Sequence, residues 1–154
     1  MNRRACAVLC CAALLLLAAA GLAQAEMSTG QTLYVPCSSH TYHGPKSRAI
    51  ELTVTLAVRN LDTRRSITLT SVDYHRTDGR LVRRYLDKPV VLGPLAAREF
   101  LVEQNDTTGG AAASFLVRWK ADVKVNEPLA EAVMITTSNS LGISYVNRGL
   151  PIQE

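Results

Sequence analysis

Residues 50–58 read IELTVTLAV, and this stretch decides the fold class of the chain. Ile50 and every second residue after it up to Val58 are apolar, while polar or small residues stand between them. Successive side chains of a strand point to opposite faces of a sheet. A period of two therefore predicts a β-strand with one buried face.

The same alternation recurs on both sides of this stretch, and turn-forming residues separate the segments. Asp78-Gly79 predicts a tight hairpin, because glycine tolerates a positive φ angle. A change of parity inside the third segment predicts a β-bulge near Thr70-Ser71. In the loop NDTTGGAAA, the pair Gly109-Gly110 favours flexibility. We expect strands at residues 31–36, 50–58, 67–75, 80–86, 89–92, 98–104, 114–121, 131–137 and 142–148.

Short strands at this spacing predict one all-β domain, and no segment has a helical period. The architecture that we expect is an immunoglobulin-like β-sandwich of about 8 strands, and a small barrel is the alternative. Trp119 alternates with Phe115 and belongs in an inner strand. Cys37 is the only cysteine after residue 25, so an internal disulfide is impossible and the core must stabilise the domain.

Residues 1–25 have the order of a secretory signal peptide. An arginine pair opens the segment, an uncharged run follows, and the small residues of AQA precede Glu26. We expect this segment to be cleaved, which leaves residues 26–154 as the mature β-sandwich domain with no stable membrane span. The alternative is an uncleaved anchor, because the apolar run approaches the ~20 residues that cross a bilayer.

The charge balance argues against a nucleic-acid partner. The chain has 17 Lys and Arg against 13 Asp and Glu, and removing the arginine pair of the signal leaves 15 and a net charge of +2. Basic residues in the mature part occur at most in pairs, at Arg64-Arg65 and Arg83-Arg84. Surfaces that follow a phosphate backbone are more densely basic.

The stretch YVPCSSHTYHGP places Cys37, His40 and His43 at equal spacing. Thiolate and imidazole are ligands of copper and zinc. Positions three apart on a straight strand point to opposite faces, so a shared metal requires a turn or loop directly after the proline. Three interpretations stay open: a copper or zinc site, a structural loop, and a surface for a partner or small ligand.

Asp73 is a further candidate, because it follows the predicted bulge and bulges often redirect side chains. The alternative is that Asp73 pairs with Arg76 or Arg83 at the end of a strand. The candidate binding residues are therefore His40, Tyr42, His43 and Asp73.

Several pieces of the sequence together resemble a bacterial family of small exported proteins of unknown function. The most specific pieces are YVP…H…YHG and YLDKPVVLGPLAAREF, and the resemblance runs from about Gln31 to Gly149. It implies a location in the cell envelope and carries no established activity. At Cys37 the family more often has an apolar residue, which weakens a metal role for this cysteine.

The function that we expect is a non-enzymatic binding or accessory module of the bacterial envelope, periplasmic or secreted. Its partner is an envelope protein or a small ligand held by loops at one end, and no cofactor is expected. The alternative is a periplasmic copper or zinc protein that uses Cys37, His40 and His43. An enzyme is not expected, because the sequence has no nucleophile elbow, P-loop or dinucleotide fingerprint.

Overall fold

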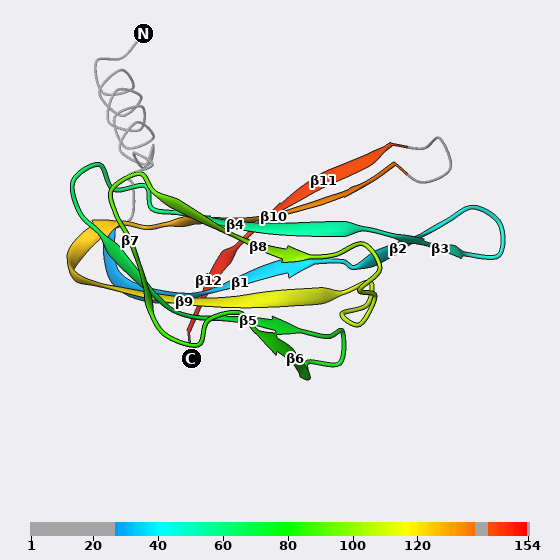
Figure 1. Ribbon diagram of the computed structural model, residues 1–154, viewed down its shortest axis with the longest axis horizontal. Coiled ribbons are helices and arrows are strands. Elements are labelled where there is room, and N and C mark those ends of the chain that lie inside the picture. The colour runs from blue at the N-terminus through cyan, green and yellow to red at the C-terminus, as the bar shows by residue number, and fades with distance from the viewer. Residues whose placement is uncertain (1–26, 138–141, 154) are drawn as a thin grey trace, which may run out of the picture.

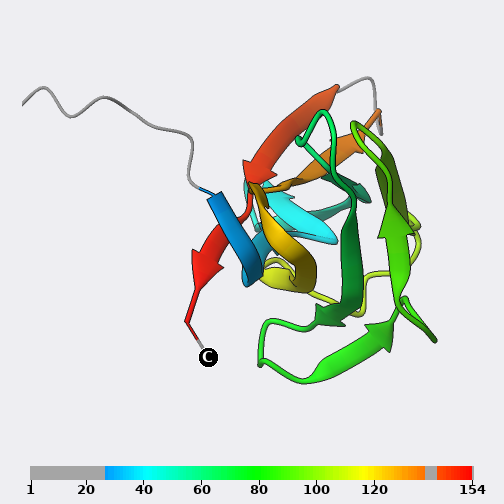
Figure 2. The same cartoon turned by 90° about the vertical axis from the view of Figure 1, so that its left-hand side faces the viewer.

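The computed structural model of the chain describes residues 27–137 and 142–153, which form a β-sandwich (Figure 1). The predicted signal peptide, residues 1–25, lies outside this range. Two antiparallel sheets face each other, as the view along the strands shows (Figure 2). Within the described ranges there is no helix that could cross a membrane. The prediction of an all-β sandwich is confirmed.

The first sheet has the order β12-β1-β9-β5-β6, and β7 pairs with β5. Its strands are β1 (Met27–Cys37), β5 (Ile67–His75), β6 (Leu81–Arg84), β7 (Val90–Leu92), β9 (Ala113–Asn126) and β12 (Leu150–Ile152).

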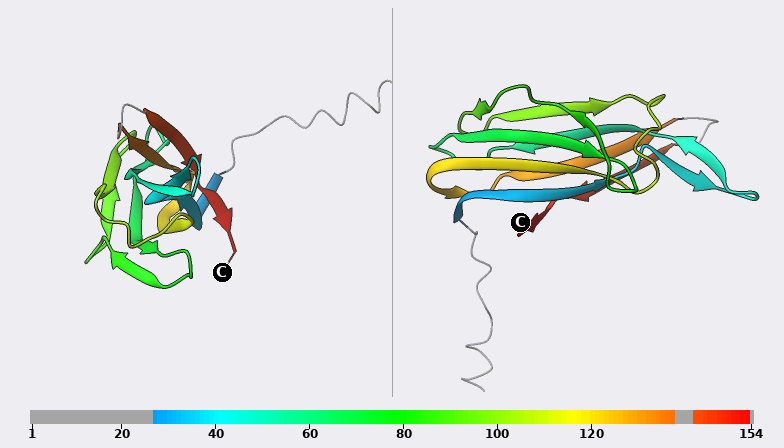
Figure 3. Two further views of the ribbon diagram at one scale, coloured as in Figure 1. Left: turned by 90° about the vertical axis from the view of Figure 1, so that its right-hand side faces the viewer. Right: turned by 90° about the horizontal axis from the view of Figure 1, so that it is seen from below.

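The second sheet has the order β11-β10-β4-β8, and a separate hairpin joins β2 to β3. The strands of the second sheet are β4 (Thr53–Arg59), β8 (Ala97–Val102), β10 (Leu129–Thr136) and β11 (Ile143–Arg148). The hairpin consists of β2 (His40–His43) and β3 (Arg48–Glu51). It projects beyond one end of the sandwich (Figure 3).

The strand order is a variant of the immunoglobulin arrangement. β4 lies beside β8 and β5 beside β9, which corresponds to the B–E and C–F pairs of the immunoglobulin sandwich. β1, however, pairs with β9, and β10 pairs with β4. The strands at positions A and G are thus exchanged between the two sheets.

The core is built from the alternating residues that the sequence pattern predicts. Val54, Leu56 and Val58 of β4 are fully buried, and Phe115 and Trp119 of β9 are 0% and 3% exposed. These side chains belong to one continuous cluster between the sheets. A single apolar interior therefore stabilises the fold, and no disulfide is present among the described residues.

Local details of β5 agree with the sequence. Its bounds are those predicted, and its register with β9 shifts between Leu69 and Ser71, where the bulge was expected. At the following hairpin Gly79 has a φ of 82°. Its N–H donates to the carbonyl oxygen of Arg76 at 2.9 Å, which closes the turn.

The predicted strand 50–58 is wrong as a single element, because the chain divides there into β3 and β4. The break is at Leu52, which is fully buried and whose N–H donates to the carbonyl oxygen of Ser39 at 2.9 Å. The sequence does not predict β2 or β12 as strands, and it assigns residues 50–51 of β3 to the strand that continues into β4. β2 reads HTYH and β12 reads LPI, so neither shows an alternation of apolar and polar residues.

Asn60 ties two connections together at the end of the sandwich opposite the β2–β3 hairpin. Its Nδ2 donates to the carbonyl oxygens of Arg65, Leu92 and Gly93 at 2.8, 3.2 and 2.8 Å. Its Oδ1 accepts the N–H of Asp62 at 2.9 Å. Because the residue is 1% exposed, these bonds replace water that cannot reach the site.

We predict that Asn60→Ala lowers the free energy of unfolding by about 3 kcal/mol, since it leaves buried carbonyl groups without a donor. Urea unfolding followed by tryptophan fluorescence measures this loss. Thr63→Ala changes an exposed side chain in the same loop and is the matched control. An equal effect of the two substitutions would contradict the role of Asn60.

Cys37 ends β1 with its side chain in the core cluster, 2% exposed. Burial removes water from the thiol and raises its pKa to about 12. The nucleophilic form of cysteine is the thiolate, which is nearly absent from this site at neutral pH.

Alkylation of Cys37 by iodoacetamide at pH 8 should therefore be at least about a hundredfold slower in the native protein than in denaturant. Mass spectrometry of timed samples gives both rates. Native labelling as fast as that of the unfolded chain would disprove the burial of the thiol.

Candidate functional site

Three connections meet at one end of the sandwich, which we call the loop end. They are residues 38–52, residues 76–80 and residues 103–112. The first contains the β2–β3 hairpin, residues 40–51, which we call the arm.

Ser39 anchors the arm to the loop that precedes β9. Its N–H donates to the carbonyl oxygen of Gly110 at 3.0 Å, and its Oγ accepts the N–H of Gly110 at 2.9 Å. Its own carbonyl accepts the N–H of Leu52 from the returning side of the arm. Since Ser39 is fully buried, it fixes both ends of the arm on the sandwich.

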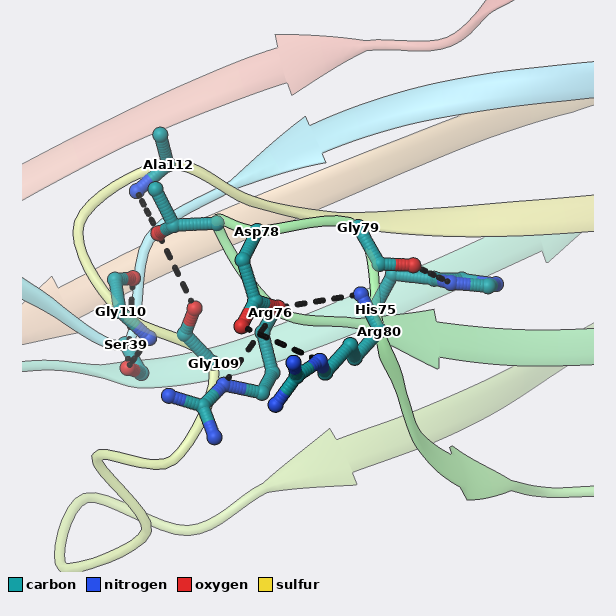
Figure 4. A network of polar contacts seen from close by, with 10 residues as sticks. Ser39, His75, Arg76, Asp78, Gly79, Arg80, Gly109, Gly110 and Ala112 are labelled. Atoms are coloured by element: carbon teal, nitrogen blue, oxygen red, sulfur yellow. Dashed lines mark hydrogen bonds and ion pairs between the residues drawn. The ribbon is translucent and has the colours of Figure 1, made fainter.

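Thr77 joins the connection of residues 76–80 to the same network, in which Figure 4 shows Ser39, Gly109 and Gly110. Its N–H donates to the carbonyl oxygen of Gly109 at 2.9 Å, and its Oγ1 accepts the N–H of Ala112 at 3.2 Å. Next to it, Asp78 forms ion pairs with Arg76 and Arg80. Side-chain and backbone bonds thus connect all three segments of the loop end.

Gly109 and Gly110 allow this close packing. A Cβ at Gly109 would lie 1.9 Å from the hydroxyl oxygen of Tyr74, and a Cβ at Gly110 would lie 2.5 Å from Oγ1 of Thr77. Gly110 also has a φ of 89°. The sequence interpretation of this pair favours flexibility. The structure shows in addition that space requires glycine at both positions and that the backbone conformation requires it at Gly110.

The arm presents an exposed tyrosine that a neighbouring histidine orients. Tyr42 is 59% exposed, and its hydroxyl oxygen lies 3.2 Å from Nε2 of His40. The two rings meet edge to face, with centroids 5.3 Å apart. His43 lies directly opposite Arg48 in the register of the two strands.

The turn at the tip of the arm has an uncommon backbone. Lys46 and Ser47 have φ angles of 66° and 49°, in the left-handed region that residues with a side chain seldom adopt. Both are exposed, so no packing of their side chains compensates for this conformation.

The predicted metal ligands do not come together. The side chain of Cys37 points into the core, whereas His40 and His43 lie on the arm, where the chain forms a strand again after only two residues. In the part of the chain that the structure describes, no group of three or more His, Cys, Asp or Glu side chains is arranged to hold a metal ion. The raised pKa of the Cys37 thiol also disfavours a thiolate ligand.

Asp73 is not part of the loop end. It forms an ion pair with Arg118 of the neighbouring strand β9, with 3.1 Å between Oδ2 and Nη1. The prediction that Asp73 pairs with Arg76 or Arg83 is wrong. Arg76 pairs with Asp78, and Arg83 pairs with Asp106. The carboxylate of Asp73 therefore links β5 to β9.

The sequence did not point to a hollow of about 300 Å³ beside the loop end, lined by Arg83, Leu101, Glu103 and Asp106. Asp106 holds the guanidinium of Arg83 at 3.0 Å, and this guanidinium lies over the ring of Tyr85. The Tyr85 hydroxyl donates to the carbonyl oxygen of Leu101 at 2.7 Å and so links the edges of the two sheets. These residues come from distant segments, and no spacing in the sequence indicates that they converge.

Comparisons with known proteins give a family and a distant structural likeness. No curated protein matches the chain. A solved structure titled "Crystal Structure of Thermotoga maritima 1070" is 7% identical with a TM-score of 0.49, and the match covers 78% of this chain and 92% of that chain. The family model "Protein of unknown function (DUF3124)" matches residues 30–152. This range includes nearly the whole sandwich, which confirms the resemblance to a family of unknown function: the chain belongs to the DUF3124 family.

Proposed function

We propose that this domain is a non-enzymatic binding module that recognises a partner protein through the loop end, with the arm as the main contact. The observation that carries the proposal is the combination of a fully buried anchor at Ser39 with an exposed ring at Tyr42. A rigid base and an accessible aromatic side chain are the two features that a recognition element needs.

Tyrosine suits this role for physical reasons. Its ring offers a large contact area and loses little conformational entropy when it is fixed, and its hydroxyl can still exchange hydrogen bonds with a partner. The contact with His40 already restricts the ring before any partner arrives. Part of the conformational entropy that the ring would lose on association is therefore already lost in the free protein.

We place this function in the bacterial cell envelope, on the basis of residues 1–25. Their arginine pair, apolar run and small-residue end are those of an export signal. The sequence also lacks the catalytic motifs of the common enzyme classes, so the proposal assigns binding and no reaction. The copper or zinc alternative is not carried further, because Cys37 faces away from His40 and His43.

The proposal is tested by in vivo photo-crosslinking with p-benzoylphenylalanine at Tyr42. We expect a discrete adduct with a partner protein after irradiation of cells that express the full chain. Leu61→p-benzoylphenylalanine is the matched control, because Leu61 is also exposed, at 41%, and lies at the opposite end of the sandwich.

Adducts of equal yield at both positions would indicate unspecific contact and contradict the proposal. The proposal would also be contradicted if no adduct formed at Tyr42 and none formed at His43, the neighbouring exposed position of the arm.

A further inference from the structure

The arm is a two-stranded sheet that shares no strand with the two sheets of the sandwich in the described structure. Each of its strands therefore has one open edge. Isolated two-stranded hairpins are only marginally stable in water, and a third strand adds stability. Open edges of this kind are templates for strand addition by another chain.

The register indicates which backbone groups face the open edges. Along an antiparallel pair of strands, the N–H and C=O groups of opposite residues point toward each other at one pair and away from each other at the next. At the base of the arm the N–H of Leu52 donates to the carbonyl oxygen of Ser39, so this pair points inward. Counting from this pair, Tyr42 and Ala49, which lie opposite each other, direct their N–H and C=O groups away from the hairpin. The open edge of β3 is thus centred on Ala49, whose small side chain leaves it accessible.

The charges of the arm favour an acidic partner at this edge. Lys46 lies in the turn at the tip and Arg48 begins β3, and no ion pair to either is found among the described residues. The one acidic residue of the arm, Glu51, lies at its base, opposite His40. An acidic strand would therefore be attracted to Lys46 and Arg48 at this edge.

We propose that an extended acidic segment of a partner protein adds to the open edge of β3 as a third strand. This inference rests on the proposed binding function and names the chemistry of the partner. Backbone bonds at Ala49 supply the strand pairing, and Lys46 and Arg48 select the charge.

The test measures fluorescence anisotropy of a labelled octapeptide of alternating valine and glutamate during titration with the purified protein. We expect binding that weakens with added salt, and at least about tenfold weaker binding by the Lys46→Glu/Arg48→Glu double variant. Arg64→Glu/Lys88→Glu changes the net charge equally at exposed sites away from the arm and should bind like the natural protein.

A second variant separates strand addition from charge attraction alone. Ala49→Pro keeps every charge of the arm and removes the N–H at the centre of the open edge, where proline is tolerated in edge strands. We expect it to weaken binding by at least about tenfold as well. Thermal unfolding followed by circular dichroism verifies that each variant remains folded.

Several results would overturn the inference. These are no binding of the valine–glutamate peptide, equal binding of a valine–lysine peptide, or unchanged binding by Ala49→Pro. Preferential binding to phosphatidylglycerol vesicles, or self-association through the arm in sedimentation velocity, would do the same. If the crosslink at Tyr42 persists in the Lys46→Glu/Arg48→Glu variant, the binding function stands and this inference fails.

Discussion

The loop end depends on the burial of Ser39 and on the hydrogen bonds that it makes there. A serine at this position in an exposed loop would bond to water and leave the chain free to move. In this protein its N–H and Oγ engage Gly110, and its carbonyl engages Leu52. Because water is excluded, breaking these bonds would leave buried polar groups without partners. The arm is therefore held in one direction although its tip contacts little else.

This anchor requires the sandwich behind it. Gly109 fits against the hydroxyl of Tyr74, and the ring of Tyr74 packs on that of Phe115 in the core. At the other end Asn60 holds two connections by side-chain bonds to their carbonyls. Because Cys37 is a buried free thiol, no disulfide joins the two sheets within the described residues. Packing and buried polar contacts together fix the geometry of the loop end.

The main strands were predictable from the sequence, because each has one face against the core and its apolar residues therefore alternate with polar ones. β5, its bulge and the hairpin at Gly79 agree in detail for that reason. The arm was not predictable, since Ile50 continues the alternation of β4 even though the chain turns at Leu52. The direction of a turn depends on contacts with Ser39 and Gly110, which are distant in the sequence from each other.

The candidate site was predicted only in part for the same reason. His40, Tyr42 and His43 do lie together on the arm. The side chain of Cys37, however, is in the core, and that of Asp73 pairs with Arg118 of the neighbouring strand. Spacing alone cannot distinguish these cases, because one residue of register moves a side chain to the other face of a strand.

Amide hydrogen exchange measured by NMR tests the anchoring of the arm most directly. We predict that the amides of Ser39, Leu52 and Gly110 exchange as slowly as those of the core strand β4, while the amide of Lys46 at the tip exchanges quickly. Fast exchange at all four positions would show that Ser39 does not fix the arm to the sandwich.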